Sequence, residues 1–162
     1  MNRAHLKGLN IKRALELAGP FLQRSGINLE GRPEPWRTAA LESVWEEVDT
    51  LSQLPDRLRI FLDEGWIMEP EAQKVLAKDQ SRKVVQGLAD ELKTVEEVTP
   101  ENYGSIVARL SKRVGLSGKN LYMPLRAALT GKTRGPELEK VFILLGKERA
   151  LQRAESALQR TG

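Results

Sequence analysis

Residues 118–138 read GKNLYMPLRAALTGKTRGPEL, and the helical pattern within this stretch decides the predicted fold. Its apolar residues recur at the i, i+4, i+7, i+8 spacing of one buried helical face. They are Leu121, Leu125, Ala128 and Leu129. We expect Gly131 to end this helix and Pro136 to begin the next, because Pro is tolerated at a first helical position. Pro124 predicts another helix start nearby if it is also a first position.

The polar face of this helix and the segments beside it are basic. Between Asn102 and Pro136 there are seven Lys or Arg and no Asp or Glu. Glu30 to Glu71, in contrast, holds eleven acidic and four basic residues, a net charge of −7. Because the whole chain carries only +4, the distribution of charge is more informative than its total. Cations beside the free N–H groups of helix starts favour a polyanion as the partner.

Composition bounds the class of protein. The chain has 162 residues, of which 40% are apolar, enough for one domain or two small helical layers. It has no Cys, which excludes disulfides, zinc–thiolate sites and thiol nucleophiles and fits a reducing compartment. No apolar run reaches membrane-spanning length, and the N-terminal MNRAHLKGLNIKR lacks the apolar part of a signal peptide. We therefore expect a cytoplasmic protein with no membrane partner.

The remaining sequence predicts an all-α fold, a compact cage of about eight helices, because helical periodicity recurs throughout without β alternation. Helix starts are predicted at Thr50 with Gln53, at Glu69-Pro70 and at Thr99-Pro100. Gly19-Pro20 predicts a bend or break, and Gly146 a division between the last two helices. We expect two helical subdomains, residues 1–98 and 99–162.

Several segments of the chain together resemble a known family. GKNLYMPLRAALTG, followed by GPEL and LLGKERALQRAESAL, is similar to the C-terminal anticodon-binding region of bacterial-type glutamyl-tRNA synthetases. The resemblance extends back through VDTLSQLP to MNRAHLKGL, which looks like the family's KLxWMN stretch entered at its Met and so favours a truncated enzyme.

This resemblance implies a module that docks the anticodon stem-loop of tRNA-Glu. The catalytic domain of the same synthetase would then act on the acceptor end with ATP and Mg²⁺. The chain itself is expected to have no catalytic residues, to bind no cofactor or metal, and to catalyse nothing.

The expected RNA contacts lie in the 118–138 stretch. The resemblance implies that Arg126 touches the anticodon and that Gly135, Pro136 and Leu138 line its pocket. Tyr122 precedes Arg126 by one helical turn, and aromatic rings and guanidinium planes are the groups that stack on RNA bases. The full predicted set is Lys119, Asn120, Tyr122, Arg126, Thr130, Lys132, Arg134, Gly135, Pro136 and Leu138.

Glu47 is the candidate for anticodon specificity. It stands immediately before VDTLSQLP, where family members that separate tRNA-Glu from tRNA-Gln resemble one another in having an Arg. A carboxylate cannot donate hydrogen bonds, so we expect similar affinity for both tRNAs. Two alternatives stay open, that the register has slipped and that Glu47 belongs to an acidic helix face without RNA contact.

Other candidate sites favour ordinary roles. The single His, His5, gives no basis for triads or multi-His metal sites. Glu42, Glu46 and Asp49 have the spacing of a solvated helix face, so we predict no metal there. The segment 109–113, RLSKR, imitates an ATP-binding loop but falls on a predicted helix. Of the three Trp, two lie in or beside apolar stripes and are more typical of core than of base stacking. The three are Trp36, Trp45 and Trp66.

Two other functions remain open at this point. One is a helical protein-interaction module whose basic face binds an acidic protein, which would need neither Tyr122 nor an exposed helix start. The other is a free-standing paralogue that binds a different RNA.

Overall fold

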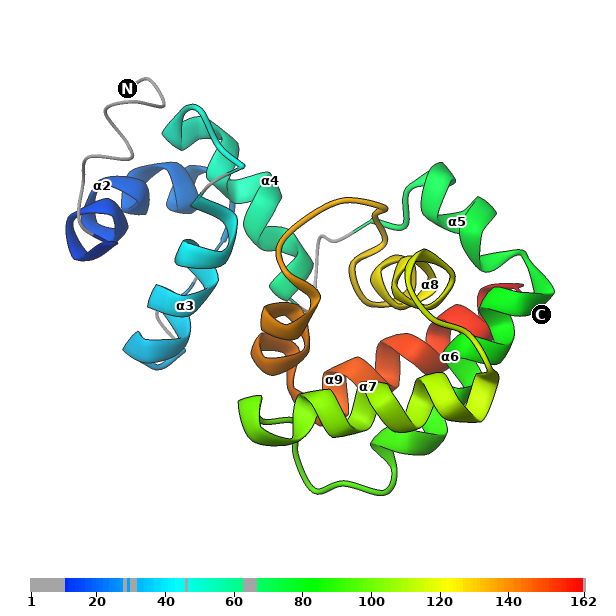
Figure 1. Cartoon of the computed structure of the whole chain (residues 1–162). Helices are drawn as coiled ribbons and strands as arrows, with labels where there is room; N and C mark the ends of the chain where they lie inside the picture. Colours follow the sequence, from blue (N-terminus) through cyan, green and yellow to red (C-terminus); the bar gives the residue numbers. More distant parts are fainter. Residues whose placement is uncertain (1–10, 28, 30–31, 46, 63–66, 162) are drawn as a thin grey trace. The chain divides into compact units, whose positions relative to one another are not determined.

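The computed structural model describes residues 11–27, 29, 32–45, 47–62 and 67–161. Within these residues the chain forms eight α-helices and two short 3-10 helices, and no strand is present (Figure 1). The predicted all-α fold of about eight helices is confirmed. His5, Glu46 and Trp66 lie outside the described residues. Among the described helices, none combines the length and the hydropathy that crossing a membrane requires.

The helices group into two compact units, Met1–Trp66 and Ile67–Gly162. The subdomain boundary expected between residues 98 and 99 falls inside the second unit. The helix Asp79–Leu92 is the reason, because it packs against all three helices that follow it and cannot be separated from them without exposing their shared core.

The first unit contains α2 (Ile11–Arg24), α3 (Glu34–Trp45) and α4 (Leu54–Leu58), with 3-10 turns at Leu51–Gln53 and Arg59–Phe61. These helices pack around a common apolar core. Its members include Ala14, Ala18, Leu41, Val44, Leu54, Leu58 and Phe61.

Trp36 packs against this core, as expected for a structural Trp. Its ring meets Phe61 edge-on, with ring centroids 6.4 Å apart. Helix α2 stays helical through Gly19-Pro20, so the predicted break there is absent. The Gln53 side-chain oxygen accepts from Thr50 N at 3.2 Å, which confirms that the capping signal marks a turn start, although the first turn is 3-10.

The second unit contains α5 (Pro70–Leu76), α6 (Asp79–Leu92), α7 (Pro100–Val114), α8 (Lys119–Thr130) and α9 (Leu138–Thr161). Helix α6 contacts α7, α8 and α9, and α5 packs on α8 (Figure 1). The predicted starts at Pro70 and Pro100 are confirmed. Gly146, with φ 80° and ψ 167°, interrupts α9, so two closing helices meet there as predicted.

Two predictions about proline are wrong. Pro124 lies inside α8, which already begins at Lys119, and Pro136 precedes α9, which begins at Leu138. The missing N–H of Pro124 costs little, because its partner would be a carbonyl in the exposed first turn of α8. Pro136 lies outside the helix because its carbonyl is engaged by a side chain of α8.

A buried carboxylate joins α6 to α7. Glu91 is almost fully buried and accepts from Arg109 Nε at 2.9 Å and from Arg113 Nη2 at 3.0 Å. Hydrogen bonding from Arg109, followed by that from Arg113, lowers the pKa of Glu91 despite its burial. The 109–113 segment therefore lies on a helix, as expected, and two of its cations are used within the fold.

Candidate nucleic-acid interface

The segment 131–137 connects α8 to α9 and is held by the end of α8. The hydroxyl of Thr130 donates to Arg126 O at 2.8 Å and accepts from Lys132 N at 3.2 Å. Gly131 ends the helix in the left-handed region, with φ 73°, as predicted. Its carbonyl accepts from Glu69 N at 2.8 Å, and an added Cβ would stand 2.5 Å from Ile67 O. The chain can make this close approach only with glycine.

Arg126 connects the two motifs of the predicted site, PLRAALTG on α8 and GPEL at residues 135–138. Its Nη1 donates to Pro136 O at 2.7 Å, a charge-assisted hydrogen bond between α8 and the 131–137 segment. An added Cβ on Gly135 would stand 3.4 Å from the same Nη1. The guanidinium is partly buried, and the hydrogen bond to Pro136 O holds its Nη1 at this segment.

Two tyrosines lie near Arg126. Tyr122 is 44% exposed, one of the few large apolar side chains of the described residues that face solvent. Tyr103 on α7 is half-buried, and its ring centroid is 5.5 Å from that of Phe142. Burial, followed by the nearby Tyr122 and Glu139, raises the pKa of Tyr103 to about 12, whereas Arg126 opposes the shift.

Tyr103 and Glu139 therefore belong to this neighbourhood, although neither was predicted as a site residue. Tyr103 stands one turn before Val107 and reads as part of the apolar face of its helix. Only the packing of α7 beside α8 reveals it.

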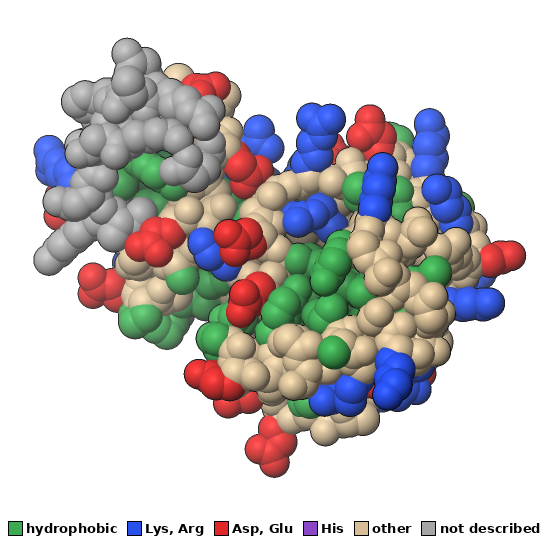
Figure 2. Space-filling model, in the orientation of Figure 1, with side chains coloured by type: hydrophobic (Ala, Val, Ile, Leu, Met, Phe, Trp, Pro, Cys, Tyr) green, Lys and Arg blue, Asp and Glu red, His purple; other side chains and the backbone are tan. Residues whose placement is uncertain are grey.

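The cations of the predicted set surround these groups. Lys119, Asn120 and Arg134 are exposed, and Lys132 Nζ lies 3.5 Å from Glu69 Oε1. Figure 2 shows Lys and Arg side chains over α5, α8 and the 131–137 segment, and hydrophobic side chains gathered between that segment and α7. This unit thus offers cations around an apolar area, the arrangement that single-stranded nucleic acids bind.

Two predicted contact residues have other surroundings. Thr130 is fully buried and Leu138 is 7% exposed, so their side chains pack beneath the surface and do not face a ligand. The helical pattern placed Thr130 on the polar face, but the chain turns back after Gly131 and uses its hydroxyl to fix the turn. Gly135 is exposed, whereas Pro136 is buried.

Glu47 belongs to the first unit and lies beyond the end of α3, not on its face. It occupies the turn after Trp45, where its N–H donates to Val44 O at 3.0 Å. Its Oε1 lies 3.7 Å from Arg57 Nη1. The specificity assigned to Glu47 stays a prediction.

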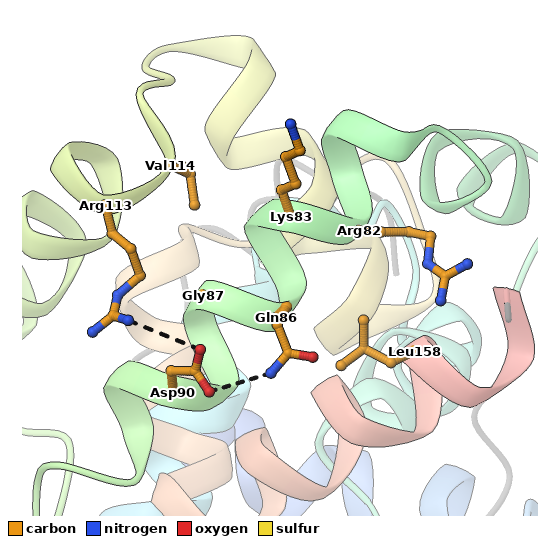
Figure 3. A pocket seen from close by; sticks show the side chains of 8 residues that line it. All are labelled: Arg82, Lys83, Gln86, Gly87, Asp90, Arg113, Val114 and Leu158. Carbon is orange, nitrogen blue, oxygen red and sulfur yellow. Dashed lines mark hydrogen bonds and ion pairs between the residues drawn. The ribbon is translucent and has the colours of Figure 1, made fainter.

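Apart from these groups, a pocket of about 620 Å³ with several basic side chains in its lining lies between α6, α7 and the end of α9 (Figure 3). Three of its polar groups, Gln86, Asp90 and Arg113, are paired with one another. Gln86 Nε2 donates to Asp90 Oδ1 at 3.2 Å, and Arg113 Nη1 lies 3.9 Å from Asp90 Oδ2. An added Cβ on Gly87 would stand 2.7 Å from Leu110 Cδ1, so the close packing of α6 on α7 forms the floor of this pocket.

No cluster of three or more His, Cys, Asp or Glu suited to a metal occurs within the residues that the structure describes. The arrangement on the second unit offers binding groups: a guanidinium held by Pro136 O, an exposed aromatic ring and a basic surround.

Comparison with known proteins agrees with this geometry. The family described as anticodon binding domain matches residues 13–158. A glutamate–tRNA ligase of Carboxydothermus hydrogenoformans is 36% identical over 94% of this chain and 32% of its own length. That of Bacillus subtilis is 31% identical over 96% of this chain and 33% of its own.

A solved glutamate tRNA ligase of Elizabethkingia meningosepticum superposes with a TM-score of 0.83 at 17% identity. The superposition covers 99% of this chain and 31% of that one, and it shows a shared fold. The chain thus spans about a third of the length of the relatives it matches. By its match over nearly its whole length, the chain belongs to the anticodon-binding domain family.

Proposed function

We propose that this chain binds the anticodon stem-loop of tRNA-Glu as the RNA-reading part of a glutamyl-tRNA synthetase. The hydrogen bond from Arg126 Nη1 to Pro136 O is the observation that carries the proposal. It holds the guanidinium where two segments meet, and the family resemblance implies that both segments contact the anticodon. Membership of the anticodon-binding domain family supports the same assignment.

The groups on the second unit suit an unpaired loop more than a duplex. The exposed ring of Tyr122 and the held guanidinium of Arg126 offer flat surfaces for unstacked bases. Lys119, Lys132 and Arg134 supply charge for the phosphates around them. Recognition of this kind requires no cofactor. ATP and Mg²⁺ would be needed only by the catalytic domain of the same synthetase.

The test is a shift assay of the chain with a tRNA-Glu transcript in excess competitor RNA. If about five phosphates are neutralised, log affinity falls with log salt with a slope of roughly −3.5 to −4.5. A flat salt response with no preference over competitor would instead favour the protein-interaction module. Pyrophosphate exchange measured in parallel should stay at background, and exchange above it would overturn the assignment of a purely RNA-binding chain.

A further inference from the structure

A pocket of about 270 Å³ lies where the first turns of α6 and α8 meet the 131–137 segment. No sequence motif pointed to it, and of its lining only Lys119 and Asn120 were predicted to contact RNA. The lining groups of interest are polar. They are Lys78, Gln80, Ser81, Lys119, Asn120 and Thr133.

Two helix N-termini border this pocket. In α6, the first helical bond runs from Arg82 N to Lys78 O, so the N–H groups before it have no carbonyl partner within the helix. In α8, the first bond runs from Leu121 N to Gly118 O, so the N–H groups of Lys119 and Asn120 also have no carbonyl partner within the helix. Both ends therefore present partial positive charge at the pocket.

Ser81 supplies an independent indication of a ligand. It is only 3% exposed and lines the pocket, yet within the described residues its hydroxyl makes no hydrogen bond. The Ser81 hydroxyl is not one of the fully buried polar atoms that lack a partner, so it opens onto the pocket and can take a hydrogen-bond partner there. A ligand oxygen in the pocket would provide that partner.

The charges around the pocket select an anion. Lys78 and Lys119 are both exposed, and neither ammonium has an ion pair in the described part of the chain. Asp79 lies in the first turn of α6 but does not line the pocket, and Glu71 meets the lining only through Thr133, whose Oγ1 donates to Glu71 Oε2 at 3.4 Å. Two ammonium groups, two helix N-termini and a hydroxyl together match the oxygens of a phosphate group.

We propose that this pocket binds one phosphate group of the RNA backbone, beside the segment that holds the anticodon. The proposal rests on the proposed function for the source of the phosphate. Position supports that source, because the pocket shares α8 and the 131–137 segment with Arg126. A base read at Arg126 and a phosphate held at Lys78 and Lys119 would fix the register of the loop.

The first arm of the test uses inorganic phosphate alone. Titration of the full chain, followed by amide NMR, should shift the signals of Gln80, Ser81, Lys119 and Asn120 more than those around Lys83. Ser81→Ala should weaken these shifts at least threefold without lowering the thermal midpoint, because it removes a hydroxyl with no protein partner. A fall in the midpoint with unchanged shifts would assign Ser81 a structural role and overturn the site.

The second arm uses tRNA-Glu and the double variant Lys78→Gln, Lys119→Gln. Loss of one neutralised phosphate should reduce the salt slope by about 1 and affinity in 0.1 M salt by roughly five- to eightfold, alike for matched and anticodon-mutated tRNA. Lys83→Gln is the control, since Lys83 lies on α6 but lines the pocket of Figure 3. It should leave the slope nearly unchanged.

The two arms separate the pocket from the proposed function. If the wild type binds tRNA but the double variant matches Lys83→Gln, the RNA-phosphate site is overturned while the function stands. If no tRNA binds but inorganic phosphate shifts the pocket amides, the function and the RNA source both fail, and a site for a free anion remains. Equal, small shifts at the pocket and at Lys83 indicate an adventitious ion only and overturn the site.

Discussion

Replacing Arg126 by Ala tests the central contact of the site. The guanidinium donates to the carbonyl of the buried Pro136 at 2.7 Å, and its loss leaves that carbonyl poorly satisfied. Hydrogen bonds of charged groups contribute about 1.5–3 kcal/mol. Because Arg126 is only partly buried, we expect the free energy of unfolding to fall by about 1–2 kcal/mol, measured by urea denaturation.

The same substitution should weaken binding of tRNA with the matched anticodon by about 1–3 kcal/mol, the range for a good base contact, which is roughly 5- to 150-fold. The assay is a binding titration against matched and anticodon-mutated transcripts. Against the mutated transcript the variant should lose much less. Lys132→Ala removes a cation whose Nζ lies 3.5 Å from Glu69 Oε1 and which we expect to contact phosphate, so it should weaken both transcripts alike.

A second control separates base reading from support of the loop. Thr130→Val removes the hydroxyl that fixes the 131–137 turn but keeps the guanidinium. It should lower stability by a similar amount and retain preference for the matched anticodon. If Arg126→Ala loses equal affinity for both transcripts, Arg126 contacts the backbone and the reasoning is refuted.

Two further predictions concern the fold and the choice of tRNA. Glu91→Gln should lower the free energy of unfolding by about 1–3 kcal/mol at neutral pH, less than for a fully buried pair because Arg109 and Arg113 are 48% and 47% exposed. The folded state lowers the pKa of Glu91 from 4.5, so this stability is present above that pH and is lost as pH falls through the folded pKa. The difference in the free energy of unfolding between wild type and Glu91→Gln should therefore be smaller at pH 3 than at pH 7. Asp90→Asn is the control with a smaller effect, and a difference that persists in acid would contradict the ion-pair explanation. The wild type should bind tRNA-Glu and tRNA-Gln with similar affinity, and Glu47→Arg should favour tRNA-Glu. Glu47→Gln controls for loss of the ion pair with Arg57. A strong wild-type preference for tRNA-Glu would disprove the role assigned to Glu47.

The sequence by itself determined most of the helices, several of their ends and the family. Thr99 and Pro100 begin α7, and Gly115 ends it, because caps depend on residues within one turn of one another. The stripe from Leu121 to Leu129 is buried as its spacing predicted. These features are local, so a single segment contains all the information that they require.

Only the tertiary structure decided which polar groups are available to a ligand. Thr130 has the spacing of a surface residue but is buried by the segment that follows it, and Tyr103 reads as core but lies beside Arg126 and Tyr122. Lys78 and Lys119 are far apart in sequence and line one pocket because α6 packs on α8. Burial and pairing depend on which distant segments meet, and side-chain periodicity within one helix does not encode that choice.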